Sequence, residues 1–598
     1  MMCQQNRIGG WFNATPPRLK LISAVILIMT AIAFAQPDTL WTSYYNDGYD
    51  NGNAGWSERC YRLIKTNNGG FLIGGQTFTP GGNRQRYPAY YIVKTDADGV
   101  EEWTGVYDVG IRHDMLCGIA LRENGQFFIA GYYVEELWKA NIIKIDANGD
   151  SLWSRDYEDY LFHNMISTSD HGILACGSGQ AHLVKVDEDG ELIWRRTYDG
   201  GGDEIFLDVV ETHDNGYAAV GWVWASVCLI LKTDANGEQE WLRTYNFTDS
   251  TETLLCVEEV PGGGYIAGGW FDSNHSLLAR FDTDGDTIWA QRDVQRIERE
   301  IKDIAPASGG GWIIVGKGRG RHGGDVYKTK RIDDLGEEVW ELGIEFDDDA
   351  SFDEATSVLA LDDGGYLIGG NRWMRWDGGN SAGLIRTEPD TVVLPFELGA
   401  LAESHDFGDS VMVDSVVTWE LPVHNFGRRY VPIDSVAITG DSSAFAYDME
   451  LPLYLYPPDT TYILVGFSPD SVGDYAAEFI FFYGDSQTVS VSLTGRGIFT
   501  NEVSGGTPLL PTQLALEPVW PNPFNGVVHI CYALPNQMLV KVTVHDVSGR
   551  EVVRLFNGVE QAGIRNRTWT ATNMPTGIYF LKITAGGEVA TTKVILLK

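Results

Sequence analysis

Short apolar runs alternate with Gly-rich polar turns along the first two-thirds of the chain. Residues 94–103, Lys-Thr-Asp-Ala-Asp-Gly-Val-Glu-Glu-Trp, show the unit of this pattern. Asp-Gly or Asn-Gly between two apolar runs favours the left-handed backbone of a tight two-residue hairpin. Each copy is therefore predicted to be a strand, a turn and a second strand that begins at the Trp.

This unit recurs with a period of roughly 41 to 51 residues, which makes it a structural repeat. Later copies end at Trp153, Trp194, Trp241, Trp289 and Trp340. Between them lie apolar runs closed by glycine, each after a turn and another apolar strand, at Gly75, Gly131, Gly177, Gly221, Gly268, Gly316 and Gly369. Seven repeats of four strands predict a seven-bladed β-propeller, because one such sheet buries both faces only by stacking between neighbours.

The strand count closes only if the two ends of this region pair. A Trp strand without a hairpin, Asp38–Trp41, stands at the start, and residues 384–388 form a hairpin strand without its Trp partner. We expect the Trp41 strand to complete the seventh blade, because that pairing hides two otherwise open edges. Deleting residues 36–45 should therefore cost much stability.

The repeat stops near residue 391, and the pattern then predicts two smaller β-domains. Pro389–Phe396 is expected to be a short linker. Residues 392–499 alternate apolar and polar positions with turn signals every 8 to 12 residues, as in an Ig-like β-sandwich. Residues 500–513 are rich in Gly, Pro, Ser and Thr and form a second linker, and residues 514–598 form another sandwich. The predicted fold is all-β, with a propeller over residues 36–391.

The N-terminal residues 1–35 have the pattern of a signal peptide. Arg7, Arg18 and Lys20 precede the apolar run Leu21–Ala35, which is shorter than the ~20 residues that a spanning helix needs. The mature protein is therefore expected to be exported and soluble. Removal of residues 1–35 changes the net charge from −38 to about −41. Such an acidic surface argues against nucleic-acid binding.

Six cysteines remain in the mature chain, and no metal-type Cys-x-x-Cys pair is present. We interpret them as small buried side chains rather than as a disulfide framework, since Cys60, Cys117 and Cys256 hold nearly equivalent places in different repeats. Alternating acids at Asp282–Asp286 and Asp146–Asp150 resemble calcium ligands, but the glycine stands at the fourth position rather than the sixth. Hairpin turns are the favoured interpretation, and no cofactor is predicted.

Candidate ligand-binding residues lie on the face with variable second-to-third loops and inter-blade crossings. Two groups are expected there: acids or amides at the starts of the innermost strands, forming an acidic channel mouth, and aromatic and basic loop residues rimming it. They are Glu58, Asp114, Asn164, Glu204, Glu252, Glu300 and Glu354, together with Trp138, Trp222, Trp224, Trp270, Arg372, Trp373, Arg375 and Trp376. The alternative is a solvated ring of acids with loop aromatics packed locally.

Several motifs resemble known families. The Gly-x-x-x-Trp spacing is similar to the tryptophan-docking repeat of pyrroloquinoline-quinone-type propellers, which implies that the Trp strand is outermost in each blade. The quinone enzymes themselves match poorly, because they resemble eight-bladed rings with adjacent cysteines and a calcium-bound cofactor. Phe407-Gly408-Asp409, residues 423–427 and 465–469, among others, resemble the abnormal-spindle/hydin class of Ig-like domains, which implies a spacer or weak protein-binding module.

The C-terminal segment carries the most specific resemblance. Trp520–Asn525 (Trp-Pro-Asn-Pro-Phe-Asn), residues 542–550 and 574–580, and the end at 592–598 resemble the C-terminal sorting domain of the type IX secretion system. This implies export across a bacterial outer membrane and contact with that secretion machinery. A flagellar-hook-capping-type Ig domain shares two of these elements, so a merely structural tail is the alternative.

Two function classes follow. The first is a secreted or cell-surface binding or adhesion protein without enzymatic activity, whose propeller face recognises a glycan or protein. The alternative is an extracellular polysaccharide lyase or hydrolase, since propellers host both. No catalytic residues are assigned, because the histidines are scattered and no nucleophile, base and orienting group can be placed together.

Overall fold

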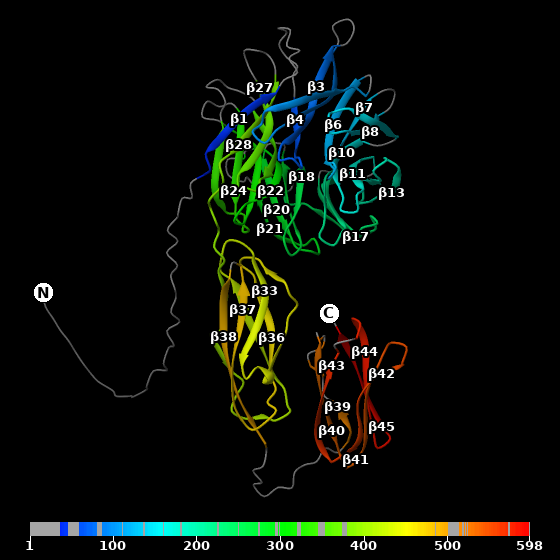
Figure 1. Cartoon of the computed structure of the whole chain (residues 1–598), viewed down its shortest axis with the longest axis vertical. Coiled ribbons are helices and arrows are strands. Elements are labelled where there is room, and N and C mark those ends of the chain that lie inside the picture. The colour runs from blue at the N-terminus through cyan, green and yellow to red at the C-terminus, as the bar shows by residue number, and fades with distance from the viewer. Residues whose placement is uncertain are drawn as a thin grey trace, which may run out of the picture.

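The described residues form β-strands apart from one short 3-10 helix, as the computed structural model shows (Figure 1). The structure describes residues 36–45, 59–80, 86–109, 112–134, 138–158, 161–179, 182–223, 227–248, 250–272, 275–292, 297, 299–319, 325–344, 353–373, 380–484, 486–499, 513–516, 519–520, 522, 524, 526–571 and 574–596. The predicted signal peptide and most of the second linker lie outside these residues. Within them, no helix has the length and apolar character needed to cross a bilayer.

The first domain consists of seven units of four antiparallel strands. Five are separate sheets, and units 3 and 4 join into one eight-stranded sheet through the single pair Ser178 and Ile205. The first four units are β2 (Arg59–Lys65), β3 (Phe71–Pro80), β4 (Arg86–Thr95), β5 (Glu101–Tyr107); β6 (Arg112–Leu121), β7 (Phe127–Val134), β8 (Trp138–Ile145), β9 (Ser151–Glu158); β10 (Leu161–Ser167), β11 (Ile173–Ser178), β12 (His182–Val186), β13 (Leu192–Thr197); and β14 (Glu204–Glu211), β15 (Tyr217–Val223), β16 (Val227–Thr233), β17 (Gln239–Tyr245).

The other three units follow the same order of strands. They are β18 (Glu252–Glu259), β19 (Tyr265–Phe271), β20 (His275–Phe281), β21 (Thr287–Arg292); β22 (Ile301–Pro306), β23 (Trp312–Arg319), β24 (Asp325–Ile332), β25 (Glu338–Ile344); and β26 (Glu354–Ala360), β27 (Tyr366–Trp373), β28 (Asn380–Thr387) with β1 (Thr39–Tyr45). The first strands of successive units contact one another, and β26 contacts β2. The series of units therefore closes on itself.

The predicted pairing of the two ends is confirmed. β1 lies antiparallel to β28, with Trp41 opposite Arg386 and Tyr45 opposite Ala382 (Figure 1). Tyr45 is buried together with Ala382 and Leu384. The N-terminal strand thus contributes both backbone pairing and apolar packing to the last unit.

A β-bulge recurs at the same place in the first strand of every unit. The register against the second strand shifts after Cys60, Leu116, Phe162, Phe206, Leu254, Ile301 and Ala355. A bulge inserts one residue and re-aims the side chains that follow it. The residues just after the bulges are Arg62, Gly118, Asn164, Asp208, Cys256, Asp303 and Ser357, a set that we call the axial ring.

The strand that carries the repeat Trp is the outermost strand of each unit. In most units the ring of this Trp lies against the turn glycine of the next unit. A Cβ built on Gly149 would lie 3.1 Å from the Trp103 ring, and one on Gly237 would lie 2.7 Å from Trp194. A tyrosine completes the contact, since the Tyr107 hydroxyl donates to the Gly149 carbonyl at 2.7 Å and Tyr198 to that of Gly237 at 2.8 Å. These contacts join neighbouring units at their outer strands.

Substituting a turn glycine tests this contact. Gly237→Ala combines a left-handed backbone, φ +74°, with a clash against Trp194, whereas Gly69→Ala has a similar φ of +86° and nothing within 4 Å. We expect Gly237→Ala to lower the free energy of unfolding by about 1–3 kcal/mol more than Gly69→Ala. Denaturant unfolding of both variants measures the difference, and equal losses would show that the Trp contact contributes nothing.

The second domain packs two sheets over one core. One sheet has the order β29 (Leu398–Ala400), β32 (Val417–Asn425), β36 (Thr460–Phe467), β34 (Phe445–Asp448); the other contains β30 (Ser404–Asp406), β38 (Gln487–Ile498), β37 (Gly473–Tyr483), β33 (Val431–Gly440), β35 (Leu453–Leu455), with β31 (Val411–Met412) on β38 and the helix η2 (Ser442–Ala444) between β33 and β34. Leu421, Val465, Phe467, Phe479 and Phe481 are fully or almost fully buried between the sheets.

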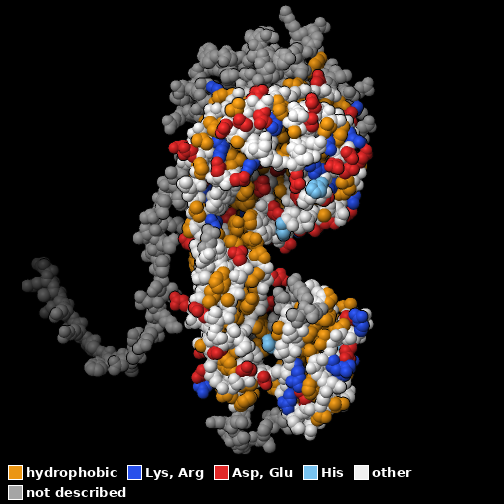
Figure 2. All heavy atoms as spheres, in the orientation of Figure 1, with side chains coloured by type: hydrophobic (Ala, Val, Ile, Leu, Met, Phe, Trp, Pro, Cys, Tyr) orange, Lys and Arg blue, Asp and Glu red, His pale blue; other side chains and the backbone are white. Residues whose placement is uncertain are grey.

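The C-terminal domain is a third, smaller β-structure. Its sheets are β39 (Ala515–Leu516), β40 (Val527–Leu534), β43 (Gly563–Thr570) and β42 (Glu551–Glu560), β41 (Met538–His545), β44 (Gly577–Ala585), β45 (Glu588–Leu596). Trp569, Phe524 and Tyr579 form an aromatic group in its core. In Figure 2 acidic side chains are spread over the visible face of the propeller, whereas Lys and Arg side chains gather on the C-terminal domain.

Residues 389–396 differ from the expected linker, because they pack against the propeller as a strap. Val392 and Leu394 are buried against Trp340 and Val339 of β25. The Asp390 carboxylate accepts hydrogen bonds from Arg331 Nη1 at 2.7 Å, Trp340 Nε1 at 2.9 Å and the Tyr366 hydroxyl at 3.1 Å. Arg331 also donates to the carbonyls of Ser308, Gly310 and Val392. Both charged side chains are fully buried.

Candidate functional site

The propeller has a face of short turns and an opposite face of longer loops. We call the first the turn face; it carries the first-to-second and third-to-fourth strand turns, each closed by backbone hydrogen bonds such as Thr66 N to Gly70 O at 2.8 Å and Asp96 N to Val100 O at 2.9 Å. The loop face carries the second-to-third loops and the inter-unit crossings.

The second domain is attached to the turn face. Tyr430 N donates to the Asp334 carboxylate at 2.6 Å, Arg429 to the Gly309 carbonyl at 3.0 Å, and Arg428 pairs with Asp333. Tyr456 donates to the Pro261 carbonyl, and the Arg280 guanidinium lies 4.7 Å from the centre of the Tyr456 ring. The loop face therefore lies on the side of the propeller away from the second domain.

Three acids expected at an open channel mouth are buried and bound to backbone. Asp114 accepts from Val109 N at 2.9 Å, Glu204 from Gly200 N and Gly202 N at 2.8 Å each, and Glu252 from Phe247 N and Thr248 N. Their exposures are 0%, 3% and 0%. These carboxylates accept hydrogen bonds from the backbone of the crossings between units. They are buried because the crossings wrap around them.

The other predicted acids and amides have separate places. Glu300 pairs with Lys302 at 3.0 Å, and Glu354 accepts from the Asn371 amide at 3.1 Å. Asn164 belongs to the axial ring and lines the central cavity. Glu58 lies outside the described residues.

The predicted aromatic rim is described in part. Trp138 is 48% exposed and its ring meets Tyr132 edge-on at 5.5 Å; Tyr132 in turn meets His163 at 6.1 Å. Burial lowers the pKa of His163 to about 4, so the imidazole is neutral, and its Nε2 lies 3.1 Å from the Ser178 hydroxyl. Trp138, Tyr132 and His163 form what we call the aromatic cluster.

The remaining rim residues are spread around the loop face. Trp222 and Trp270 are the last residues but one of their second strands and are half-buried. The Arg372 guanidinium lies 4.6 Å from the centre of the Tyr44 ring. For Trp373 only the backbone is described. Trp224, Arg375 and Trp376 lie outside the described residues.

A cavity of about 640 Å³ lies on the propeller axis and is lined by the first strand of every unit. Its wall includes Arg62, Asn164, Asp208, Asp303 and Ser357 of the axial ring, and it continues along these strands toward the turn face, past Lys65, Leu121 and Ser167. Arg62 Nε donates to the Asn164 carbonyl oxygen at 3.3 Å, and the Asn164 amide donates to Asp208. The repeated bulges thus concentrate polar side chains on the axis.

Each acid of the axial ring is held by the following unit. Asp208 accepts from Val257 N at 2.8 Å, and Asp303 accepts from the Ser357 hydroxyl and Val358 N at 2.9 Å each. Burial raises the pKa of Asp208 to about 6 and also raises that of Asp303, while the Arg62 charge opposes both shifts. Sequence reasoning missed these residues, although charged side chains in strands where other repeats have small or apolar ones were a visible signal.

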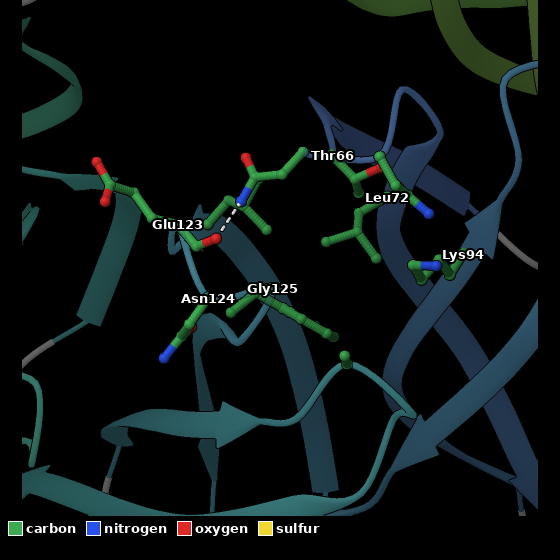
Figure 3. A pocket seen from close by; sticks show the side chains of 11 residues that line it. Thr66, Leu72, Lys94, Glu123, Asn124 and Gly125 are labelled. Atoms are coloured by element: carbon green, nitrogen blue, oxygen red, sulfur yellow. Dashed lines mark hydrogen bonds between the residues drawn. The ribbon is translucent and has the colours of Figure 1, made fainter.

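A smaller pocket of about 340 Å³ opens between units 1 and 2 on the turn face (Figure 3). Leu72 and Phe127 form its buried floor, and Asn67, Asn124 and Glu123 form its exposed rim. The Asn67 amide donates to the Glu123 carbonyl at 2.9 Å, as the dashed line in Figure 3 marks. This bond fastens the turn of unit 1 to the turn of unit 2 at the rim of the pocket.

The calcium-like sequences form turns. Asp146 Oδ1 accepts from Asn148 N at 2.8 Å and Asp150 N at 2.9 Å, and Asp282 does the same for Asp284 and Asp286. No group of three or more His, Cys, Asp or Glu residues within the described ranges is placed to hold a metal ion. The six cysteines within the described residues are free thiols.

The C-terminal domain matches a known family. Residues 518–597 fit the family described as the secretion system C-terminal sorting domain. The protein is exported by type IX secretion to the cell surface or the extracellular space. This sorting domain also implies an interaction with the secretion machinery.

Part of the propeller matches a second family. Residues 139–242, from β8 into β17, fit the family described as the outer membrane protein assembly factor BamB. This match supports propeller repeats of the pyrroloquinoline-quinone-like type. No curated protein matches the chain.

Solved structures similar to this chain have low identity to it. They include a protein of unknown function from Bacteroides caccae, at 13% identity over 45% of this chain and 94% of that one with a TM-score of 0.32. A streptogramin B lyase has 11% identity over 58% and 98%, with a TM-score of 0.36. A protein from Lactobacillus plantarum has 11% identity over 53% and 97%, with a TM-score of 0.32. These likenesses do not identify a ligand.

Proposed function

We propose that this is a secreted or cell-surface binding protein without enzymatic activity, whose propeller recognises an extracellular glycan or protein through the loop face. In this proposal the seven four-stranded units are the blades of one propeller, and residues 392–499 and 514–598 are Ig-like sandwiches that space and sort it. The match of residues 518–597 to the sorting domain supports export.

The observation that carries the proposal is the aromatic cluster on the loop face. Large exposed aromatic rings offer apolar area at a low cost in side-chain entropy, and they anchor many binding surfaces. Trp138 is 48% exposed and is braced by Tyr132. The second domain contacts the opposite face, so it leaves this side to a partner. The rim proposed to extend this surface comprises Trp222, Trp224, Trp270, Arg372, Trp373, Arg375 and Trp376.

Mutation of Trp138 tests the proposal. A glycan and protein screen with the mature chain first identifies a ligand, and Trp138→Ala is then expected to weaken that binding about tenfold or more. Ile193→Ala is the control, because Ile193 is 53% exposed but lies on β13, an outermost strand. Binding that survives in both variants would contradict the aromatic-cluster site, and release of a shortened glycan product would favour the lyase or hydrolase.

A further inference from the structure

The axial cavity contains an acid that the fold does not use. Glu258 of β18 stands two residues after the axial-ring position of its strand and lines the same cavity. Within the described part of the chain, its carboxyl has no hydrogen bond or ion pair. Asp208 and Asp303, by contrast, are each bonded to the backbone of the next unit. Unlike Asp208 and Asp303, the Glu258 carboxyl is therefore available to a ligand.

The charges around Glu258 favour a cation. Asp208, Asp303 and Glu259 are the acids that act on it, and Arg62 is the cation of the axial ring. Burial, reinforced by these acids, raises the pKa of Glu258 well above its ordinary value. A carboxyl in this state gains from an entering positive charge, because a nearby cation stabilises its ionised form. The strongly acidic chain, with a net charge of −38, adds to this attraction.

We infer that the axial cavity is a binding site for a primary ammonium group, which Glu258 contacts from the turn-face side. An ammonium is a compact charge with three donors, so it can bind Glu258 and neighbouring oxygens together. The cavity volume of about 640 Å³ is within the usual range for small-ligand sites. The same chemistry occurs in a free polyamine and in the lysine side chain of a protein partner.

The site is separate from the one proposed for the loop face. The cavity wall runs from the axial ring to the ends of the first strands, where the turns begin. The second domain hydrogen-bonds to the turns of units 5 and 6, at Pro261, Gly309 and Asp334, and makes no such bond to the turns of units 1 to 4 within the residues that the structure describes. A ligand can therefore approach from the side of those units.

Calorimetric titration of the mature chain with spermidine tests the inference. At physiological ionic strength, where weak surface attraction is screened, Glu258→Gln is expected to weaken spermidine binding about tenfold or more. Glu188→Gln is the matched control, because it makes the same acid-to-amide change at an exposed position on the turn face. Val210→Lys is the second variant: Val210 lines the cavity on β14, next to β18, and a lysine there supplies an internal ammonium and should abolish binding.

The outcomes separate the sources of the ammonium. A lysine-containing peptide that binds, while its Nε-acetylated form does not, indicates a protein partner; binding of spermidine alone indicates a free polyamine. The inference is overturned if neither probe binds, if Glu258→Gln binds as the parent does, or if Glu188→Gln loses as much affinity as Glu258→Gln. Thermal melting of each variant confirms folding, and Trp138→Ala should leave spermidine binding unchanged.

Discussion

Replacing Asp390 by alanine is expected to lower the free energy of unfolding by about 3–5 kcal/mol, because it leaves the Arg331 guanidinium buried without its counter-charge. Both side chains are fully buried. Three donors, on Arg331, Trp340 and Tyr366, converge on one oxygen of this carboxylate. Loss of the acceptor strands all three donors inside the protein, where an unsatisfied polar group is costly.

Denaturant unfolding of a chain that begins at residue 36 measures the effect, with Asp362→Ala as the control. Asp362 pairs with Lys65 but its side chain is 91% exposed, so we expect that loss to be about 1 kcal/mol or less. The double variant Arg331→Met with Asp390→Ala removes the orphaned charge and should recover part of the stability. Equal midpoints for Asp390→Ala and Asp362→Ala would show that the strap is not a stabilising element.

Deleting residues 36–45 is the second large effect, with an expected loss of about 3–5 kcal/mol. The deletion removes the buried Tyr45 and the Trp41 ring, which lies against Gly99, and it leaves β28 as an open edge. An unpaired edge strand is also a template for association. The truncated protein should therefore melt earlier and aggregate more readily than the parent.

A peptide of residues 36–45 provides the test of specificity. If the open edge of β28 is the cause, this peptide should bind there and stabilise the folded state. The melting temperature of the truncated protein should then rise with the peptide concentration. Leu40→Ala in the full chain is the point-mutation control, because Leu40 is 54% exposed on the same strand. An unchanged melting curve after truncation would contradict the closure.

The arrangement of strands was predictable because it depends on local signals. Asp-Gly and Asn-Gly turns mark the hairpins, and Trp103 and its equivalents mark the outermost strands, so the pairing of the Trp41 strand with residues 384–388 followed from counting. These signals act through backbone geometry within a few residues, which a single sequence displays directly.

The strap and the site depended on contacts between residues far apart in the chain. Pro389–Phe396 has the composition of a linker, and nothing in it reveals that Asp390 meets Arg331, 59 residues earlier. Asp114 and Glu252 were placed at a channel mouth from their position, but the backbone N–H groups of the crossings bind their carboxylates. Asp208 and Asp303 differ visibly from their equivalents Gly118 and Cys256, but the sequence does not show the recurring bulge that aims them at the axis.

The strap also has a mechanical consequence for a protein held at its C-terminal end. The chain leaves the propeller after β28, the strand that pairs with β1. Without the strap, tension from the C-terminal side would act directly on this pairing and could separate the two strands. Asp390 follows β28 in the chain and forms a buried ion pair with Arg331 on β24 of the neighbouring unit. Tension applied at the C-terminal end would therefore load β24 through the Asp390–Arg331 pair before it loads the pairing of β28 with β1.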